Sequence, residues 1–229
     1  MTTDFPAAVL WDMDGTLVDT EPYWMRAETE LVESFGGVWT HADCMKLVGS
    51  GLWASAEILR SAGVDMEPDA IVQTLTDRVQ QQLERAGVPW RPGARELLAE
   101  LRRNGVPTAL VTMSVRRMAD QISGLIGFPA FDVVVAGDSV ENAKPHPEPY
   151  LTGAMLLGVD TSRCVAIEDS VPGLASAVAA GAVAIGVPHH LALPESDAYT
   201  LWDSLGDRTI ADLASVFRTR PAVEGVVAP

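Results

Sequence analysis

The sequence contains little cysteine and little positive charge. Its two cysteines, Cys44 and Cys164, lie too far apart for a metal-binding spacing, so we expect both to be reduced, buried thiols. Lysine and arginine number 16 against 31 aspartate and glutamate residues, which gives a formal net charge of −15. This excess of acid argues against nucleic acid or an anionic membrane surface as a partner. Local cations and backbone N–H groups would have to hold any phosphate ligand.

Long hydrophobic runs are also absent. No apolar stretch reaches the ~18 residues that cross a membrane, and the longest run of small apolar residues, 171–187, is interrupted by one proline and three glycines. The first residues include an acid and no basic group, unlike a signal peptide. The four histidines have no metal-ligand spacing, and none is expected to be catalytic. We therefore expect a cytoplasmic monomer with no membrane partner.

A short apolar run near the N-terminus ends in two carboxylates. Residues 8–11 (AVLW) are apolar, and Asp12, Asp14 and Gly15 follow at once. Such a run is typical of a buried strand in a parallel sheet, where ligands bind at the carboxyl ends of the strands. An acidic surface turn would explain the same residues, and so would the start of a calcium loop. The calcium loop requires a glutamate at its twelfth position, where this chain has Tyr23.

The pattern of the chain changes near residue 90. Before it, the spacing of apolar residues is helical, with helices expected at 23–35, 41–48, 52–61 and 68–85. After it, helices alternate with short apolar strands, which we expect at 106–112, 131–136, 163–167, 183–187 and 207–210. This alternation predicts an α/β fold, a doubly wound parallel sheet that includes the strand at 8–11.

The helical segment is then an insertion into the sheet domain. We predict an α/β core domain formed by residues 1–17 and 89–217, a small α-helical cap domain at 18–88 and a flexible C-terminal tail at 218–229. The cap would be connected to the core by two short linkers. A domain on two such linkers can close over the strand end at Asp12 as a lid.

Polar residues follow three of the later strands. They are Thr112, Met113 and Ser114 after the first, Lys144 beyond the second, and Glu168 and Asp169 at the end of the third. Each has a plainer interpretation, because threonines and acids cap helices and loop lysines are mostly solvated. Side by side at one sheet edge, however, four carboxylates and one lysine cannot all be ionised and unpaired. A hard divalent cation such as Mg²⁺ would resolve the conflict.

Four motifs together resemble the haloacid dehalogenase-like hydrolase superfamily. They are WDMDGTLVDT at 11–20, VT at 111–112, KPHPEPY at 144–150 and EDS at 168–170. The similarity is strongest to the branch with a helical cap inserted after the first motif, which includes phosphoglycolate phosphatases, sugar-phosphate phosphatases and β-phosphoglucomutases. It covers nearly the whole chain. The resemblance implies a Rossmann-like core and a Mg²⁺-dependent phosphatase that works through an aspartyl-phosphate intermediate.

The resemblance also implies a role for each motif residue. Asp12 would be the nucleophile, and Asp14 would protonate the leaving alkoxide and then deprotonate the attacking water. Thr112 and Lys144 would bind the phosphoryl oxygens, with Lys144 also paired to Asp12. Met113 and Ser114 adjoin Thr112 and would belong to the same phosphate site. Mg²⁺ would be held by Asp12, Asp169 and the carbonyl of Asp14, with Glu168 contributing directly or through water.

Departures from the family narrow the reaction. Dehalogenases of this superfamily lack the second aspartate, and β-phosphoglucomutases carry a histidine where this chain has Trp24. We therefore expect a phosphatase for small phosphorylated metabolites, in particular a sugar phosphate, with a phosphomutase or a non-catalytic regulatory protein as alternatives. Cap residues Trp24, Lys46, Gly49 and Trp53 are expected to contact the substrate, although both tryptophans fit a cap core equally well.

Overall fold

The computed structural model describes residues 5–219, and its centre is a six-stranded sheet. The strands are β1 (Ala8–Trp11), β2 (Thr108–Val111), β3 (Val133–Val135), β4 (Cys164–Glu168), β5 (Val183–Gly186) and β6 (Tyr199–Leu201). They are all parallel and lie in the order β3-β2-β1-β4-β5-β6. The predicted doubly wound α/β fold is confirmed, with β1 in the middle of the sheet, between β2 and β4.

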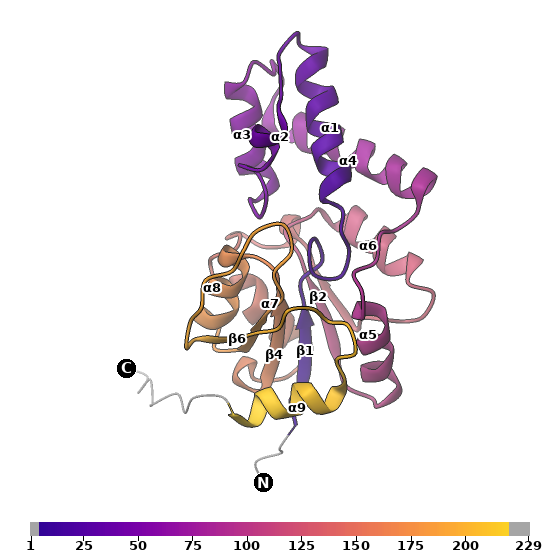
Figure 1. The fold of residues 1–229 in the computed structure, drawn as a ribbon, viewed down its shortest axis with the longest axis vertical. Coiled ribbons are helices and arrows are strands. Elements are labelled where there is room, and N and C mark those ends of the chain that lie inside the picture. The colour runs from indigo at the N-terminus through magenta and orange to yellow at the C-terminus, as the bar shows by residue number, and fades with distance from the viewer. Residues whose placement is uncertain (1–4, 220–229) are drawn as a thin grey trace.

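Helices cover both faces of this sheet (Figure 1). They are α5 (Ala94–Arg103), α6 (Arg116–Leu125), α7 (Glu148–Leu156), α8 (Val171–Ala179) and α9 (Ile210–Thr219). Val9 and Trp11 of β1 pack into a cluster with α5, α6 and α9, while Ala8 and Leu10 pack on the opposite face with α7 and α8. Successive side chains of β1 point to opposite faces of the sheet, and all four are buried because helices cover both faces. This explains the unbroken apolar sequence of the strand.

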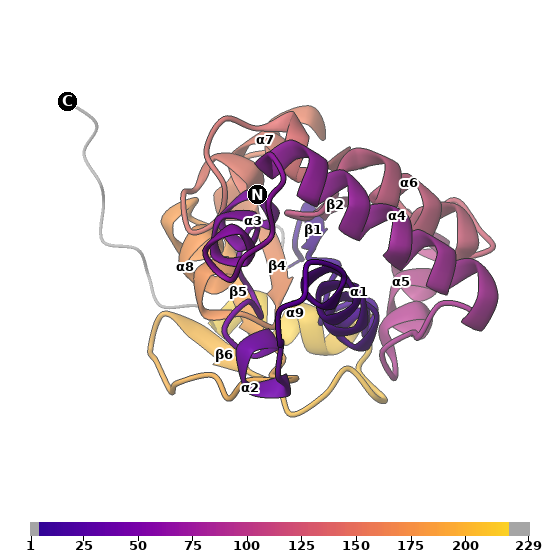
Figure 2. The ribbon, with the colours of Figure 1, turned by 90° about the horizontal axis from the view of Figure 1, so that it is seen from above.

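The remaining helices stand beyond the carboxyl end of the sheet. They are α1 (Glu21–Ser34), α2 (His41–Cys44), α3 (Leu52–Ser61) and α4 (Pro68–Ala86). Both α1 and α3 pack on α4, and from above α1, α3 and α4 lie around the end of β1 (Figure 2). No helix among residues 5–219 is long and apolar enough to cross a bilayer.

Two neighbouring linkers join these helices to the sheet. Val18 and Trp90 form an antiparallel bridge, the backbone N–H of Asp19 donates to Pro89 O at 2.8 Å, and that of Arg91 donates to Leu17 O at 3.0 Å. The two linkers are therefore hydrogen-bonded to each other as a short ribbon.

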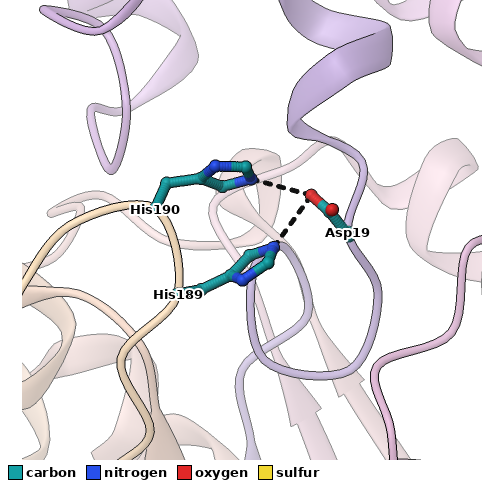
Figure 3. A group of neighbouring side chains, drawn as sticks. All are labelled: Asp19, His189 and His190. Carbon is teal, nitrogen blue, oxygen red and sulfur yellow. Dashed lines mark hydrogen bonds and ion pairs between the residues drawn. The ribbon is translucent and has the colours of Figure 1, made fainter.

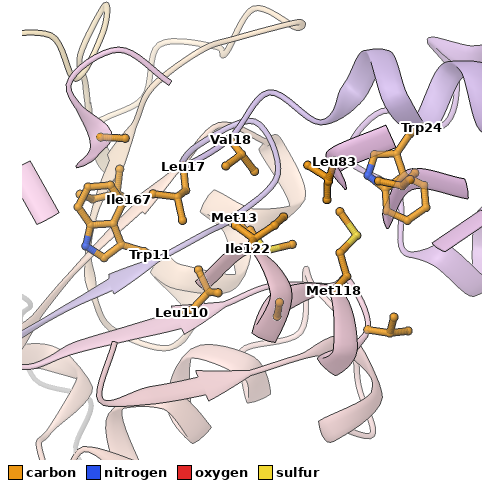
Figure 4. Packing of buried hydrophobic residues seen from close by; sticks show 14 of the residues in the cluster. Trp11, Met13, Leu17, Val18, Trp24, Leu83, Leu110, Met118, Ile122 and Ile167 are labelled. Atoms are coloured by element: carbon orange, nitrogen blue, oxygen red, sulfur yellow. The ribbon is translucent and has the colours of Figure 1, made fainter. Parts of the chain in front are cut away.

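The buried core also continues past the linkers. Leu17 and Val18 of the first linker belong to one buried cluster with Met118 of α6 and with Leu83 and Trp24 of the upper helices (Figure 4). Apolar packing thus holds the helices on the sheet in the observed arrangement, since burying each such side chain contributes about 1.5–3 kcal/mol.

Three predicted elements differ from the structure. The last strand is β6 rather than residues 207–210, where Thr209 instead begins α9 by hydrogen-bonding to Asp212 Oδ2 through its backbone N–H and its hydroxyl, at 2.8 and 2.7 Å. The helix expected at 41–48 ends at Cys44 as α2, closed at its start by a capping box between Thr40 and Asp43. The expected tail begins later than predicted, since Arg218 and Thr219 belong to α9; residues 220–229 lie outside the described part.

Candidate active site

The site is built on the residue that follows β1. Asp12 is 7% exposed, and its Oδ1 accepts a hydrogen bond from Lys144 Nζ at 2.7 Å. Lys144 lies in the loop before α7, and its Nζ also donates to Glu168 Oε1 at 2.6 Å and to Val111 O at 2.8 Å. Burial alone would lower the pKa of Lys144, but the charges of Asp12 and Glu168 raise it above its usual value.

Two glycines allow the acids to approach this point closely. Gly15 has φ +88°, and a Cβ built on it would lie 1.9 Å from Asp169 Oδ2. A Cβ on Gly173 would lie 2.0 Å from Glu168 Oε2. Glu168 is fully buried, and it is held by the Tyr150 hydroxyl, which donates to Oε1 at 2.7 Å. Gly15, in the turn after β1, and Gly173, at the start of α8, thus leave room for the two carboxylates because neither glycine carries a side chain.

The carboxylates at this end of the sheet outnumber the cations. Asp12, Glu168 and Asp169 offer oxygens that all lie within 4.8 Å of one another, and Asp12 Oδ2 is buried with no hydrogen-bond partner among the described residues. Burial and the Glu168 charge raise the pKa of Asp12 to about 7 in spite of Lys144, and burial with the Asp12 charge raises that of Asp169 well above its usual value. Hard oxygen ligands with excess negative charge fit Mg²⁺.

Asp14 lies apart from this group and is surrounded by donors. The hydroxyls of Thr20 and Ser114 donate to it, the latter at 2.7 Å, and the Thr112 hydroxyl lies 3.4 Å from the same oxygen as Ser114. Trp24 Nε1 lies 3.5 Å from the other oxygen. Asp14 is therefore held between the ends of β1 and β2 and the first turn of α1.

A single cavity contains most of the predicted site. Its lining from the sheet side is Asp12, Asp14, Gly15, Thr112, Met113, Ser114, Lys144, Asp169, Ser170, Pro172 and His190. Its lining from the helices above is Glu21, Trp24, Glu28, Leu47, Val48, Gly49, Ser50, Leu52, Ser55 and Leu75. Glu168 lies beneath this lining, in contact with Lys144. Strand ends distant in the sequence meet here because the strands are parallel neighbours.

Two of the four expected cap residues do not reach the cavity. Trp24 and Gly49 line it, but Lys46 and Trp53 do not. Lys46 points away and forms an ion pair with Asp43 at 2.7 Å, and Trp53 is 38% exposed with its Nε1 donating to Asp69 at 2.8 Å. In this arrangement neither reaches the cavity: Lys46 lies in the turns that follow α2, and Trp53 lies in the first turn of α3.

Sequence reasoning missed two acids on α1. Glu21 and Glu28 lie three before and four after Trp24, so all three share one face of the helix and line the cavity. Burial and the charge of Glu28 raise the pKa of Glu21 to about 8, and burial raises that of Glu28 to about 7, where Trp39 Nε1 at 3.4 Å works against the shift. The helical spacing of Glu21, Trp24 and Glu28 was the signal available in the sequence. An acid in the first turn of a helix, such as Glu21, has an ordinary structural explanation, however, because it interacts favourably with the helix dipole.

A second charged cluster lies beside the linkers (Figure 3). Asp19 Oδ1 is 2.8 Å from His190 Nε2 and 3.0 Å from His189 Nε2, the latter outside hydrogen-bond alignment. Arg91 donates to His189 Nδ1 and, at 3.3 Å, to Pro188 O. Because arginine only donates, His189 Nδ1 must be the unprotonated nitrogen and Nε2 carries the proton. With Nε2 of His189 protonated beside Asp19, the group as it stands is a charge network.

Comparison with known proteins agrees with this geometry. Residues 6–181 match the model of the haloacid dehalogenase-like hydrolase family. Hexitol phosphatase A of Escherichia coli is 34% identical over 181 residues, which are 78% of this chain and 81% of that protein. The chain is also 32% identical over 219 residues to SUPPRESSOR OF QUENCHING 1, chloroplastic, of Arabidopsis thaliana, but spans only 20% of that longer protein.

A solved structure shows the same architecture. CbbY from Rhodobacter sphaeroides, in complex with xylulose 1,5-bisphosphate, superposes with a TM-score of 0.79 at 29% identity, covering 89% of this chain and 96% of that one. The family match extends over more than half of the chain and includes the strand ends that carry Asp12, Thr112, Lys144 and Asp169. The chain belongs to the haloacid dehalogenase-like hydrolase family.

Proposed function

We propose that this protein is a Mg²⁺-dependent phosphoric monoester hydrolase that acts on small sugar phosphates through an aspartyl-phosphate intermediate. The observation that carries the proposal is Asp12, a buried carboxylate at the floor of the cavity with Lys144 on one oxygen and no partner on the other. Family membership and the similarity to a hexitol phosphatase support the reaction class. That the enzyme is a cytoplasmic monomer stays a prediction.

The mechanism assigns different tasks to the two aspartates. Asp12 attacks phosphorus, the bond between phosphorus and the leaving oxygen breaks, and Asp14 gives its proton to that oxygen. Water then attacks phosphorus, the bond between phosphorus and the Asp12 oxygen breaks to release phosphate, and Asp14 takes the proton of that water. Thr112 and Ser114, whose hydroxyls lie beside Asp14, would bind phosphoryl oxygens together with Lys144.

A cation completes the charge balance of the site. Asp12, Asp169 and the backbone carbonyl of Asp14 would hold Mg²⁺, with Glu168 contributing directly or through water. The bound cation would offset the repulsion between the Asp12 carboxylate and the phosphate. Lys144 contributes to the same end from the other side of Asp12 and keeps that carboxylate in place. We further propose that residues 18–88 form a cap domain that moves relative to the sheet at the paired linkers.

Turnover of 4-nitrophenyl phosphate tests this proposal directly. The wild-type protein with Mg²⁺ should release phosphate from it, and Asp12→Asn should release none, because an amide is not a nucleophile at phosphorus. Asp203→Asn, at an exposed position away from the cavity, is the matched control and should retain activity. Undiminished turnover by Asp12→Asn would overturn the mechanism.

A phosphomutase remains the main alternative reaction. It would move phosphate between positions of one sugar without net release, so a phosphate-release assay separates the two. Trp24 occupies the wall near Asp14, with its Nε1 3.5 Å from Asp14 Oδ1, at the position where the resemblance to mutases would require histidine. This observation favours the hydrolase.

A further inference from the structure

The wall of the cavity opposite the nucleophile is acidic. Glu21 and Glu28, one helical face of α1, line it on either side of Trp24. Glu28 is 4% exposed. The two carboxyl groups are close enough for the charge of Glu28 to raise the pKa of Glu21. A leaving group attached to a phosphate on Asp12 would therefore meet two carboxyl groups and an indole.

No free cation is available to balance a second anion in the cavity. Of the described residues that line it, Lys144 is the only lysine or arginine. Its ammonium group already contacts Asp12 and Glu168, at 2.7 and 2.6 Å. His190 is the only lining histidine among them, and it is held 2.8 Å from Asp19. Among the described lining residues, no cation thus stands free to balance a second anion near the α1 wall.

We propose that Glu21 and Glu28 select an uncharged, polyhydroxylated leaving group and reject a leaving group that carries a second phosphate or a carboxylate. This inference rests on the proposed phosphatase function and specifies its substrate class. The substrate is then the monophosphate of a neutral sugar or sugar alcohol.

Hydrogen-bond chemistry supports this choice. A sugar hydroxyl can donate to an ionised carboxylate and can accept from a protonated one, so it suits Glu21 and Glu28 in either state. Burial has already raised the pKa of both groups, to about 8 and about 7, which shows how poorly this wall accommodates negative charge. A second anion would find no free cation among the described lining residues, and it would face like charge whenever these acids are ionised, which opposes binding. Trp24 adds an apolar surface for the carbon-bound hydrogens of the sugar.

A purely structural role of Glu28 must be distinguished from recognition. Trp39 Nε1 lies 3.4 Å from Glu28 Oε2, so this acid also connects α1 to the segment before α2. Loss of that contact would weaken activity toward every substrate alike. Recognition changes the ratio between substrates that differ only in charge, and this ratio is the quantity to measure.

Fructose 6-phosphate and fructose 1,6-bisphosphate form a suitable pair, because they differ only in the second phosphate. We expect wild-type kcat/KM, from phosphate release at fixed free Mg²⁺, to favour the monophosphate by at least about 100-fold. At about pH 9, above both raised pKa values, both carboxyl groups are ionised. The double variant Glu21→Gln with Glu28→Gln should then reduce this ratio by about tenfold or more, since the like charge is removed. Glu33→Gln, an exposed acid on α1 outside the cavity, should leave the ratio unchanged.

The outcomes separate this inference from the function on which it rests. If neither fructose phosphate nor 4-nitrophenyl phosphate is hydrolysed, the proposed function fails. If 4-nitrophenyl phosphate is hydrolysed but the wild-type ratio is near one or favours the bisphosphate, only the inference is overturned. A ratio that the Glu21 and Glu28 double variant leaves at the wild-type value overturns it too, and circular dichroism of that variant verifies that it is folded.

Discussion

Two clusters of ionisable groups flank the first linker, and they differ in charge balance. Around Lys144, three carboxylates share one ammonium group, and Asp12 Oδ2 has no partner among the described residues. Near Arg91, one carboxylate, Asp19, contacts two histidines, and the guanidinium group of Arg91 donates to one of them, His189. Both contain three side chains of the kinds that bind metals. Composition alone therefore does not distinguish a cation site from a closed network.

The pKa directions do distinguish them. Burial and neighbouring carboxylates raise the pKa of Asp12 to about 7 and that of Asp169 well above its usual value. Burial would also raise the pKa of Asp19, but the neighbouring histidines hold it below its usual value. The first cluster has fewer positive charges than carboxylates, and the second does not. A group of acids that resists ionisation in the absence of a cation is the better candidate for binding one.

The largest expected effect is a difference in catalytic activity between a variant of the Lys144 cluster and a variant of the Arg91 cluster. Asp169→Asn should lower kcat/KM for 4-nitrophenyl phosphate by on the order of 10³-fold, because a metal supplies several kcal/mol of transition-state stabilisation. Asp19→Asn should retain activity within about tenfold of the wild type, since Asp19 does not line the cavity. Initial rates over a Mg²⁺ titration provide the measurement. If both variants were equally inactive, the two clusters would not have separate roles.

A smaller effect concerns the pH dependence of stability in metal-free protein. The pKa of Asp12 is raised from 3.8 to about 7, so its contribution to the free energy of unfolding is fully present below pH ~4 and is lost as pH rises toward 7. Asp12→Asn should remove this slope, on the order of 3 kcal/mol between pH 4 and 7.5. Urea denaturation with a chelator present measures it, with Asp203→Asn as the control. A slope unchanged by Asp12→Asn would contradict the charge imbalance.

The smallest effect has the opposite sign of pH dependence. Because the pKa of Asp19 is lowered, its stabilisation is present above pH ~4 and is lost as pH falls below that value. Asp19→Asn should cost about 0.5–1 kcal/mol at neutral pH, since the group is partly exposed and screened by solvent. The midpoint of urea unfolding at pH 7 and pH 3.5 measures it. Equal losses at both pH values would show that packing, and not ionisation, is responsible.

The grouping of site residues at the carboxyl end of the sheet was predictable for two simple reasons. Apolar runs mark buried strands, and parallel strands bring their carboxyl ends together, so Asp12, Thr112, Lys144 and Asp169 were expected at one edge. The residues found there came from four separate segments. Lys144 is the exception among them, because it lies in the loop before α7 and reaches Asp12 only through the path of that loop.

The residues missed or misplaced depend on features that spacing does not encode. Lys46 was misplaced because α2 ends at Cys44 instead of continuing. The network of Asp19, His189 and Arg91 forms only because both linkers pass the loop after β5. The edge strand β6 has three residues, none fully buried, so no apolar run marks it. Local sequence patterns thus predict helices and strands, but they do not predict which loops come into contact in the folded protein.

Gly15 has a consequence beyond its own turn. Asp169 Oδ2 occupies the place where any β-carbon at position 15 would stand. The glycine carries no side chain, and this absence lets Asp169, a proposed metal ligand, lie close to the turn that follows Asp12. A scan of all substitutions should therefore find position 15 as intolerant for catalysis as position 169. These two positions, 154 residues apart in sequence (169 minus 15), constrain each other as one steric unit.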